Sequence, residues 1–201
     1  MQAMQTTTRA TATGPETPSP LERMYAAIRA ATRVPADWQT VVDAVVADLS
    51  GKLPPADEVL QEVPARARRG SDRSQVLHVE PDGSFSVVAL ISRPGQATSV
   101  HDHTTWCAVV VVAGTEYEER FSLDESGRAL LLTGTRTDQA GTVSGFAPPG
   151  DIHRVTNAGA TVGVSLHVYG TDIGRIGNSV RRTYDLPIVE PNEIAGTTKK
   201  E

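Results

Sequence analysis

Cysteine is nearly absent from this sequence of 201 residues, which contains only Cys107. A single cysteine excludes an internal disulfide framework and is typical of a reducing compartment. Long apolar runs are also missing: no stretch approaches the ~20 residues that cross a bilayer, and the first residues lack the apolar segment of a secretory signal. We therefore expect a cytoplasmic protein without a membrane partner.

Positive charge is scarce as well. The chain has 19 Lys and Arg against 24 Asp and Glu, which gives a net charge of −5 and a pI near 5.5. Nucleic-acid-binding domains are usually basic, so we expect no nucleic-acid partner. The length suits one domain with a sizeable core, and the sequence leaves the oligomeric state open.

The first part of the chain has a tail and a helical segment. Residues 1–18 are rich in Thr, Ala and Pro, which predicts a disordered tail. A helical pattern follows over residues 19–70. Ser19 followed by proline is typical of a helix N-terminus, Asp37 can cap a second helix, and a third can follow the prolines at 54–55. We expect the apolar stripes of these helices to pack on a sheet.

From about residue 71 the pattern changes to short β-rich runs separated by Gly, Pro or Asp. We expect strands at 76–80, 84–92, 106–113, 115–121, 128–133, 141–147 and 161–169. Many short strands at this spacing predict an antiparallel sandwich or barrel. The predicted barrel region extends to about residue 190, and residues 191–201 are expected to form a tail.

Two histidines stand just before the most apolar run of the sequence. His101 and His103 are two residues apart, so in a strand both imidazoles point to the same face. Neutral imidazole is the commonest protein ligand of transition metals, and the pair therefore indicates a metal site. A third histidine, His153, follows a Pro-Gly turn and begins another β-prone segment.

A third motif, S-x-H-x-Y, lies in the last predicted strand of the barrel. Alternation puts Ser165, His167 and Tyr169 on one face and Leu166 and Val168 on the other. Such a face is either the polar interior of a barrel or a solvated surface, and the pattern does not distinguish them.

These motifs carry a family resemblance. G-x5-H-x-H over residues 95–103 and P-x-G-x2-H-x3-N over residues 148–157 resemble the two cupin motifs. Cupins usually have a glutamate ligand soon after the second histidine, but residues 104–108 contain no carboxylate. Three histidines without that glutamate, followed by S-x-H-x-Y, are similar to the thiol dioxygenases, which include cysteine dioxygenase and 3-mercaptopropionate dioxygenase. The resemblance covers about residues 73–187 and implies a mainly β fold, a cupin (jelly-roll) β-barrel over 71–190 preceded by a short helical segment.

The resemblance also implies a cofactor and a reaction. It implies a mononuclear Fe(II) held by His101, His103 and His153, with three positions left open. A small thiol and O2 can then meet on one ion, and both oxygen atoms end on sulfur as a sulfinic acid. Histidine ligands alone would also accept zinc, nickel or copper.

The family resemblance assigns roles to the third motif and to the cysteine. Ser165, His167 and Tyr169 match the family's relay, in which the tyrosine hydroxyl lies beside the iron and donates a hydrogen bond to the reactants. In eukaryotic cysteine dioxygenases a cysteine near the first motif is joined to this tyrosine by a thioether. Cys107 lies four residues after His103, one fewer than in that pattern, so we interpret it as a buried apolar side chain.

The group that binds the substrate carboxylate is left open. Cysteine dioxygenases have an arginine at the position that Gln75 occupies here, and glutamine at this place is similar to the mercaptopropionate-type enzymes. Arg73 lies two residues earlier on the same strand face, and Arg175 is a further candidate, as are Arg181 and Arg182. The sequence favours a small thiol carboxylate, without an obligatory amine, as the substrate.

The hypothesis is thus an Fe(II)-dependent thiol dioxygenase that oxidises 3-mercaptopropionate or L-cysteine. One alternative is a metal-dependent cupin of another class, either an isomerase or a dioxygenase with a non-thiol substrate. The other is a cupin that binds a small molecule without turning it over. The S-x-H-x-Y motif argues against both.

Overall fold

The computed structural model of the protein describes residues 17–63 and 74–189. Helices come first, as the sequence predicts: α1 (Pro20–Thr32), α2 (Trp38–Leu49) and α3 (Ala56–Glu62). Ser19 and Glu22 cap α1 reciprocally, each side chain bonding the backbone N–H of the other residue. The Asp37 carboxylate accepts a hydrogen bond from the backbone N–H of Thr40 and caps α2.

Within the described residues the rest of the chain forms strands and one short helix. The strands are β1 (Ser74–Val79), β2 (Ser86–Ser92), β3 (Val100–His103), β4 (Cys107–Ala113), β5 (Thr115–Leu123), β6 (Leu130–Gln139), β7 (Val143–Phe146), β8 (His153–Asn157), β9 (Gly163–Tyr169), β10 (Val180–Tyr184) and β11 (Ile188–Val189). The helix α5 (Ile173–Ile176) precedes β10. The sequence analysis did not predict α5, β10 or β11.

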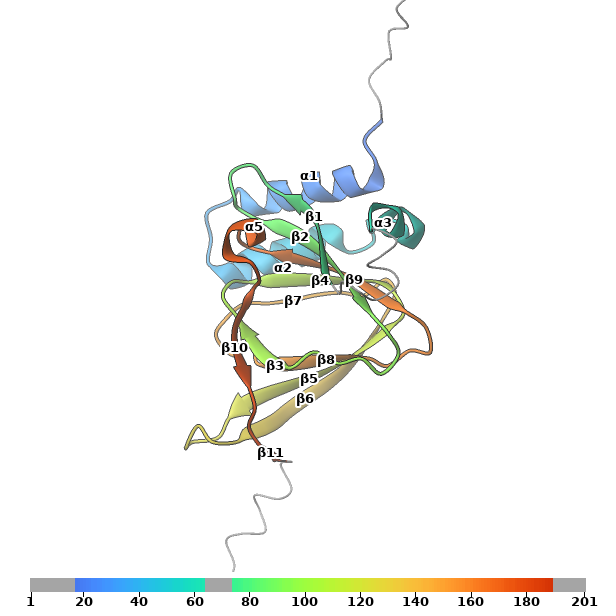
Figure 1. Ribbon diagram of the computed structural model, residues 1–201. Coiled ribbons are helices and arrows are strands. Elements are labelled where there is room, and N and C mark those ends of the chain that lie inside the picture. Colours follow the sequence, from blue (N-terminus) through green and yellow to red (C-terminus); the bar gives the residue numbers. More distant parts are fainter. Residues whose placement is uncertain (1–16, 64–73, 190–201) are drawn as a thin grey trace, which may run out of the picture.

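The strands form two sheets that face each other across a hollow (Figure 1). One has the order β1-β2-β9-β4-β7, and the other has the order β10-β3-β8-β5-β6-β11. Neighbouring strands are antiparallel, apart from β11 on β6. The protein is therefore mainly β, with the two-sheet barrel that the resemblance to a cupin (jelly-roll) implies and a helical segment at its N-terminal side.

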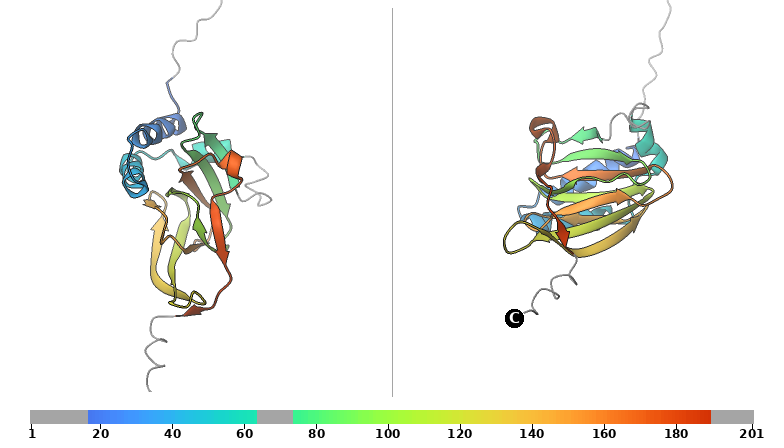
Figure 2. Two further views of the ribbon diagram at one scale, coloured as in Figure 1. Left: turned by 90° about the vertical axis from the view of Figure 1, so that its left-hand side faces the viewer. Right: turned by 60° about the horizontal axis from the view of Figure 1, so that its bottom comes forward.

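The helices cover the outer face of the first sheet (Figure 2). Strand β9 shows why, because Val164, Leu166 and Val168 belong to the same buried cluster as the apolar faces of α1 and α2. Burying one such side chain contributes about 1.5–3 kcal/mol. Gly145 of β7 lies directly under α2, where an added Cβ would come within 2.5 Å of a methyl group of Val42. The absence of a side chain there lets the helix approach the sheet closely.

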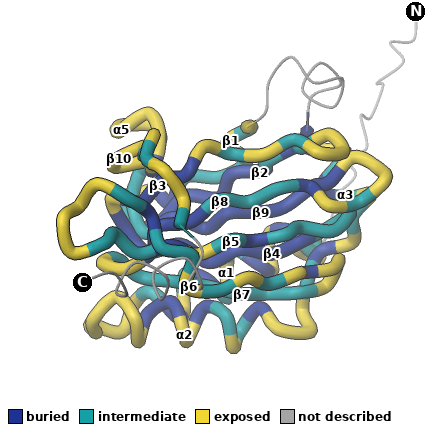
Figure 3. Tube along the Cα trace, turned by 90° about the horizontal axis from the view of Figure 1, so that it is seen from below, coloured by how far each residue is buried: buried dark blue, intermediate teal, exposed yellow. Residues whose placement is uncertain are grey.

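The opposite face of β9 points into the barrel, between the two sheets. Figure 3 shows β9 and its neighbours β2 and β4 as largely buried strands. Ser165, His167 and Tyr169 line an internal cavity. Of the two interpretations of the S-x-H-x-Y face, the polar interior is therefore the observed one.

The tail predictions for 1–18 and 191–201 lie outside the described residues, except at 17–18. The boundary predicted between 19–70 and 71–190 falls within the undescribed residues 64–73 and stays a prediction. Among the helices within 17–63 and 74–189, none is both long and apolar enough to cross a membrane.

Candidate metal centre

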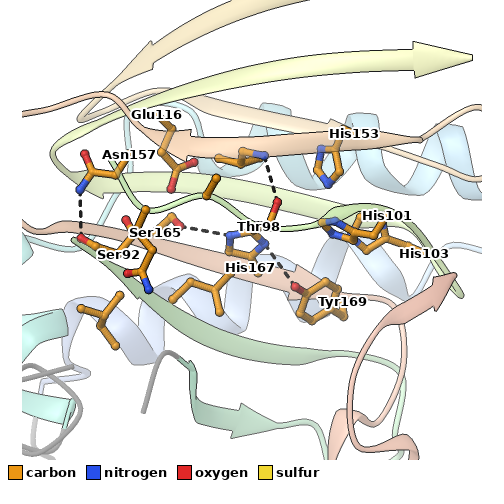
Figure 4. Close-up of a pocket in the computed structure, with 15 residues that line it drawn as sticks. Ser92, Thr98, His101, His103, Glu116, His153, Asn157, Ser165, His167 and Tyr169 are labelled. Carbon is orange, nitrogen blue, oxygen red and sulfur yellow. Dashed lines mark hydrogen bonds between the residues drawn. The ribbon is translucent and has the colours of Figure 1, made fainter. Parts of the chain in front are cut away.

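Three buried histidines meet inside the barrel (Figure 4). His101 and His103 come from β3 and His153 comes from β8, and His101 and His153 are directly paired across the two strands. Their ring centroids are 4.7 to 5.1 Å apart. One nitrogen of each ring lies within 4.8 Å of the others, so the three imidazoles could hold one metal ion.

The second nitrogen of each ring is held by an acceptor. The Nδ1 atoms of His101, His103 and His153 lie 2.9 Å from the Ser99 carbonyl oxygen, 3.0 Å from Asp151 Oδ2 and 2.8 Å from Glu118 Oε1. An acceptor at Nδ1 favours the tautomer with the proton on that nitrogen. The lone pair is then on Nε2, which is the arrangement that a metal ion requires.

Burial keeps the imidazoles of His101 and His103 uncharged. Desolvation lowers the pKa of His101 to about 4, and the nearby His153 acts in the same direction. Burial also lowers the pKa of His103, although the hydrogen bond with Asp151 opposes it. Neutral rings at neutral pH are ready to bind a metal, because a protonated imidazole is no ligand.

The carboxylates behind the rings are ionised. Burial raises the pKa of Glu118, but the hydrogen bond with His153 and the charge and hydrogen bond of Arg120 outweigh burial and lower it to about 2. For Asp151 the hydrogen bonds from His103 likewise outweigh burial and lower the pKa. Sequence reasoning missed both groups. Asp151 stands two residues before His153, and Glu118 is fixed only by the pairing of β5 with β8.

A Glu118→Gln variant is expected to bind Zn²⁺ or Co²⁺ about 10–100-fold more weakly than the native chain, because a neutral amide orients His153 less firmly and raises its basicity less. Competition with a chelator of known affinity measures this. Glu119→Gln is the matched control, since Glu119 pairs with Arg154 and lies on the other face of the strand. Equal affinities of the two variants would contradict the role of Glu118.

Beside the histidines runs a chain of hydrogen-bonding side chains from β9. The Tyr169 hydroxyl lies 3.3 Å from His167 Nδ1, and His167 Nε2 lies 3.1 Å from the Ser165 hydroxyl. Burial lowers the pKa of His167 to about 3, so its ring is neutral at neutral pH. Burial, together with the nearby Cys107, raises the pKa of the Tyr169 hydroxyl and keeps its proton in place.

Cys107 faces the same residues. It is the cross-strand partner of Tyr169, and its Sγ lies 3.8 Å from His167 Nδ1. The side chain is fully buried among Val88, Val109 and Tyr169, as the sequence interpretation of a buried apolar residue predicts. Burial raises the pKa of its thiol, so this sulfur stays protonated.

The histidines and the relay open onto one internal cavity of about 160 Å³. A cavity of about 150 Å³ holds benzene, which has as many non-hydrogen atoms as 3-mercaptopropionate. His101, His103, His153 and Tyr169 lie at one end of the cavity in Figure 4. The polar side chains Ser92, Glu116 and Asn157 lie at the other end.

The family model for cysteine dioxygenase type I matches residues 67–178. The chain belongs to this family. Type I cysteine dioxygenases are metal-dependent, and the match includes all three histidines and the relay residues.

Three solved structures show a partial likeness to this chain. A cupin 2 conserved barrel domain protein from Salinispora arenicola is 21% identical over 57% of this chain and 92% of its own, with a TM-score of 0.39. A recombinant oxalate oxidase in complex with glycolate is 18% identical over 52% of this chain, and oxalate decarboxylase from Bacillus subtilis is 25% identical over 45%. Their TM-scores are 0.40 and 0.37, and the chain spans only 54% and 22% of their lengths.

Two of the residues predicted to bind the substrate, Gln75 and Arg175, do not line this cavity. Gln75 is the cross-strand partner of Ala89, which packs toward the helices, so Gln75 lies on the outer face of the sheet. Its amide instead donates to the Val76 carbonyl oxygen at 3.2 Å. Arg175 is exposed on α5, and Arg73 lies outside the described residues.

The other two arginine candidates are engaged elsewhere. Arg182 binds the buried carboxylate of Asp102 at 2.7 Å, and Arg181 lies 3.9 Å from it. Tyr184 donates its hydroxyl proton to the same oxygen at 2.9 Å. These contacts fasten β10 to β3, the strand of His101 and His103. No lysine or arginine within the described ranges lines the cavity.

Proposed function

We propose that this chain is an Fe(II)-dependent thiol dioxygenase that converts a small thiol carboxylate, 3-mercaptopropionate or L-cysteine, to the sulfinic acid with O2. The observation that carries the proposal is the juxtaposition of three buried imidazoles with the Tyr169 hydroxyl in one small cavity. The family match supports the reaction type. The ligands would be His101, His103 and His153.

The donor set fits iron. All three ligands are imidazoles, which bind a metal as uncharged donors, and no carboxylate of the described residues adds to the cluster. An iron ion held in this way would keep its positive charge, stabilise a thiolate, and bring thiol and O2 together in one coordination sphere. The reaction balances without a further reductant, because sulfur loses the four electrons that O2 gains.

The protein's own contribution lies around these ligands. Asp151, Glu118 and the Ser99 carbonyl hold the imidazoles in place through Nδ1. Tyr169 presents a hydroxyl that burial keeps protonated, and it can donate a hydrogen bond where charge develops on oxygen. The cavity of about 160 Å³ limits the water around the reactants and selects small substrates.

A direct test follows O2 uptake and product formation together. Iron-loaded protein is expected to consume one O2 for each sulfinate formed from 3-mercaptopropionate or L-cysteine. The measurement combines an oxygen electrode with chromatography of the product, and zinc-loaded protein serves as the inactive control. If the iron-loaded protein consumes no O2 with several small thiols, the proposed function is wrong.

No specific observation favours the second candidate, a metal-dependent cupin that acts on a non-thiol substrate. It makes no use of the Tyr169–His167–Ser165 arrangement.

A further inference from the structure

Glu116 is a cavity-lining carboxyl group that the proposed reaction leaves without a role. It lies on β5 between Asp138 of β6 and Asn157 of β8, its two cross-strand partners. Alternation along β5 puts it on the inner face together with Glu118, whose carboxylate holds His153. Figure 4 shows Glu116 pointing into the cavity toward Ser165.

Glu116 lies at the Ser165 end of this hydrogen-bonded chain. Its carboxyl group faces the Ser165 hydroxyl in Figure 4, and the interaction with this hydroxyl lowers the pKa of the carboxyl group. Ser165 lies 3.1 Å from His167 Nε2, and His167 Nδ1 lies 3.3 Å from the Tyr169 hydroxyl. The chain therefore runs from a titratable carboxyl group at one end to the Tyr169 hydroxyl beside the metal ligands at the other.

Ser165 and His167, the middle members of this chain, can each donate one hydrogen bond. A hydroxyl donates once, and a neutral imidazole donates from one nitrogen and accepts at the other. The hydrogen bonds of such a chain therefore all point the same way. With Glu116 ionised, Ser165 must donate to the carboxylate, His167 donates from Nε2 to Ser165, and Tyr169 donates to His167 Nδ1.

With Glu116 protonated, the opposite direction becomes available. The carboxylic acid donates to Ser165, and Ser165 donates to His167 Nε2. The ring then carries its proton on Nδ1 and donates it to the Tyr169 oxygen. The proton of the Tyr169 hydroxyl is released to point toward the metal site. The Ser179 hydroxyl, which also bonds to Tyr169, can accept or donate and so fits both directions.

We propose that Glu116 is the fourth member of the relay and that its protonation state decides whether the Tyr169 hydroxyl donates toward the metal site. Glu116 acts through Ser165 and His167, and is thus a positioning residue. The inference rests on the proposed function for its catalytic consequence, but the direction of the hydrogen bonds is a property of the protein alone.

The surroundings of Glu116 favour a proton on it. Burial raises its pKa, the Ser165 hydrogen bond lowers it, and the charges of Asp138 and Glu118 raise it again. His153 of β8 acts weakly in the lowering direction. The other titratable or charged groups nearby are His167 of β9, which is neutral, Cys107 of β4, whose thiol is protonated, and Arg136 of β6, which pairs with Asp138 and Glu118. The net pKa of Glu116 lies above its usual value.

The direction of the hydrogen bonds in this chain can be measured without a metal ion and without turnover. Nitrogen-15 chemical shifts of imidazole distinguish the Nδ1–H from the Nε2–H tautomer, and His167→Asn identifies the signals of His167. In metal-free native protein we expect His167 to change from Nδ1–H to Nε2–H as the pH rises through the pKa of Glu116. Glu116→Gln should abolish this change, and Glu119→Gln, on the outer face, should leave it intact. A single tautomer at every pH in the native protein, or the same titration in Glu116→Gln, would overturn the inference.

A second experiment relates the direction of these hydrogen bonds to the rate of turnover. In iron-loaded native protein, kcat should fall about tenfold for each pH unit above the pKa of Glu116, because the proton that frees the Tyr169 hydroxyl is lost. Glu116→Gln should remove this decline, whereas Glu119→Gln should keep it. A decline that persists in Glu116→Gln would contradict the catalytic part. If no thiol is oxidised at all, the proposed function fails, while the tautomer experiment still decides the inference.

Discussion

A His153→Ala variant will hold no metal ion at the centre and will consume no O2 with any small thiol. His153 is the one ligand from β8, and it is fastened by Glu118 at 2.8 Å. Without it only the two imidazoles of β3 remain. Since weakening a supporting contact alone costs about 10–100-fold in metal affinity, loss of a ligand is expected to cost more than about 100-fold. Elemental analysis and an oxygen electrode measure the two effects.

His78→Gln is the matched control for this variant. His78 lies on β1 outside the cavity, where it contacts Glu80 at 3.0 Å and stacks on Tyr25. The His78→Gln variant should retain its metal and its turnover, and circular dichroism should show that both variants are folded. The assignment of the centre would be refuted by a folded His153→Ala protein with native metal content, or by an equal loss of metal in His78→Gln.

A Tyr169→Phe variant will keep its metal but oxidise thiols ~10²–10³-fold more slowly in kcat, the cost typical of removing one positioned hydrogen-bond donor. The ring stays in place among Val88, Val109 and Cys107, so the cavity keeps its shape. Loss of the hydroxyl leaves His167 and Ser179 with one partner fewer, which costs about 1 kcal/mol in the free energy of unfolding. Single-turnover kinetics separates the chemical step from thiol binding.

The control for the tyrosine is Tyr117→Phe. Tyr117 lies on β5 between Glu116 and Glu118, and alternation turns it away from the inner face of the strand on which those two residues lie. Its kcat should equal that of the native chain. Native turnover in Tyr169→Phe, or an equal slowing in Tyr117→Phe, would remove the Tyr169 hydroxyl from the reaction.

Much of the fold could be predicted because its determinants are local. Ser19 and Asp37 cap the helices they were expected to cap, since a side-chain oxygen needs only the next three residues to do so. Likewise, the alternation of Ser165 and His167 with apolar neighbours predicted a strand with one polar and one apolar face. The strand could not show which face was inner, because that depends on the α1 and α2 helices packed against the other side.

The supporting residues of the site could not be predicted because they depend on strand pairing. Glu118 reaches His153 only through the register of β5 against β8, and Asp151 reaches His103 across 48 residues of sequence. Gln75 is the opposite case, a residue predicted in the site that strand pairing places outside it. Counting along the chain suggested a pocket residue, whereas the register of β1 against β2, interrupted by an irregularity between Val76 and His78, sets it on the outer face. A one-residue difference in register reverses the face of a side chain.

The most direct test of the account is the fate of the oxygen atoms in an ¹⁸O2 atmosphere. Iron-loaded protein supplied with 3-mercaptopropionate or L-cysteine should yield a sulfinic acid in which both oxygens come from the same O2 molecule, as a mixture of ¹⁸O2 and ¹⁶O2 with mass spectrometry will show. Disulfide with hydrogen peroxide, or a sulfinate with oxygen from water, would contradict a thiol dioxygenase built on His101, His103 and His153.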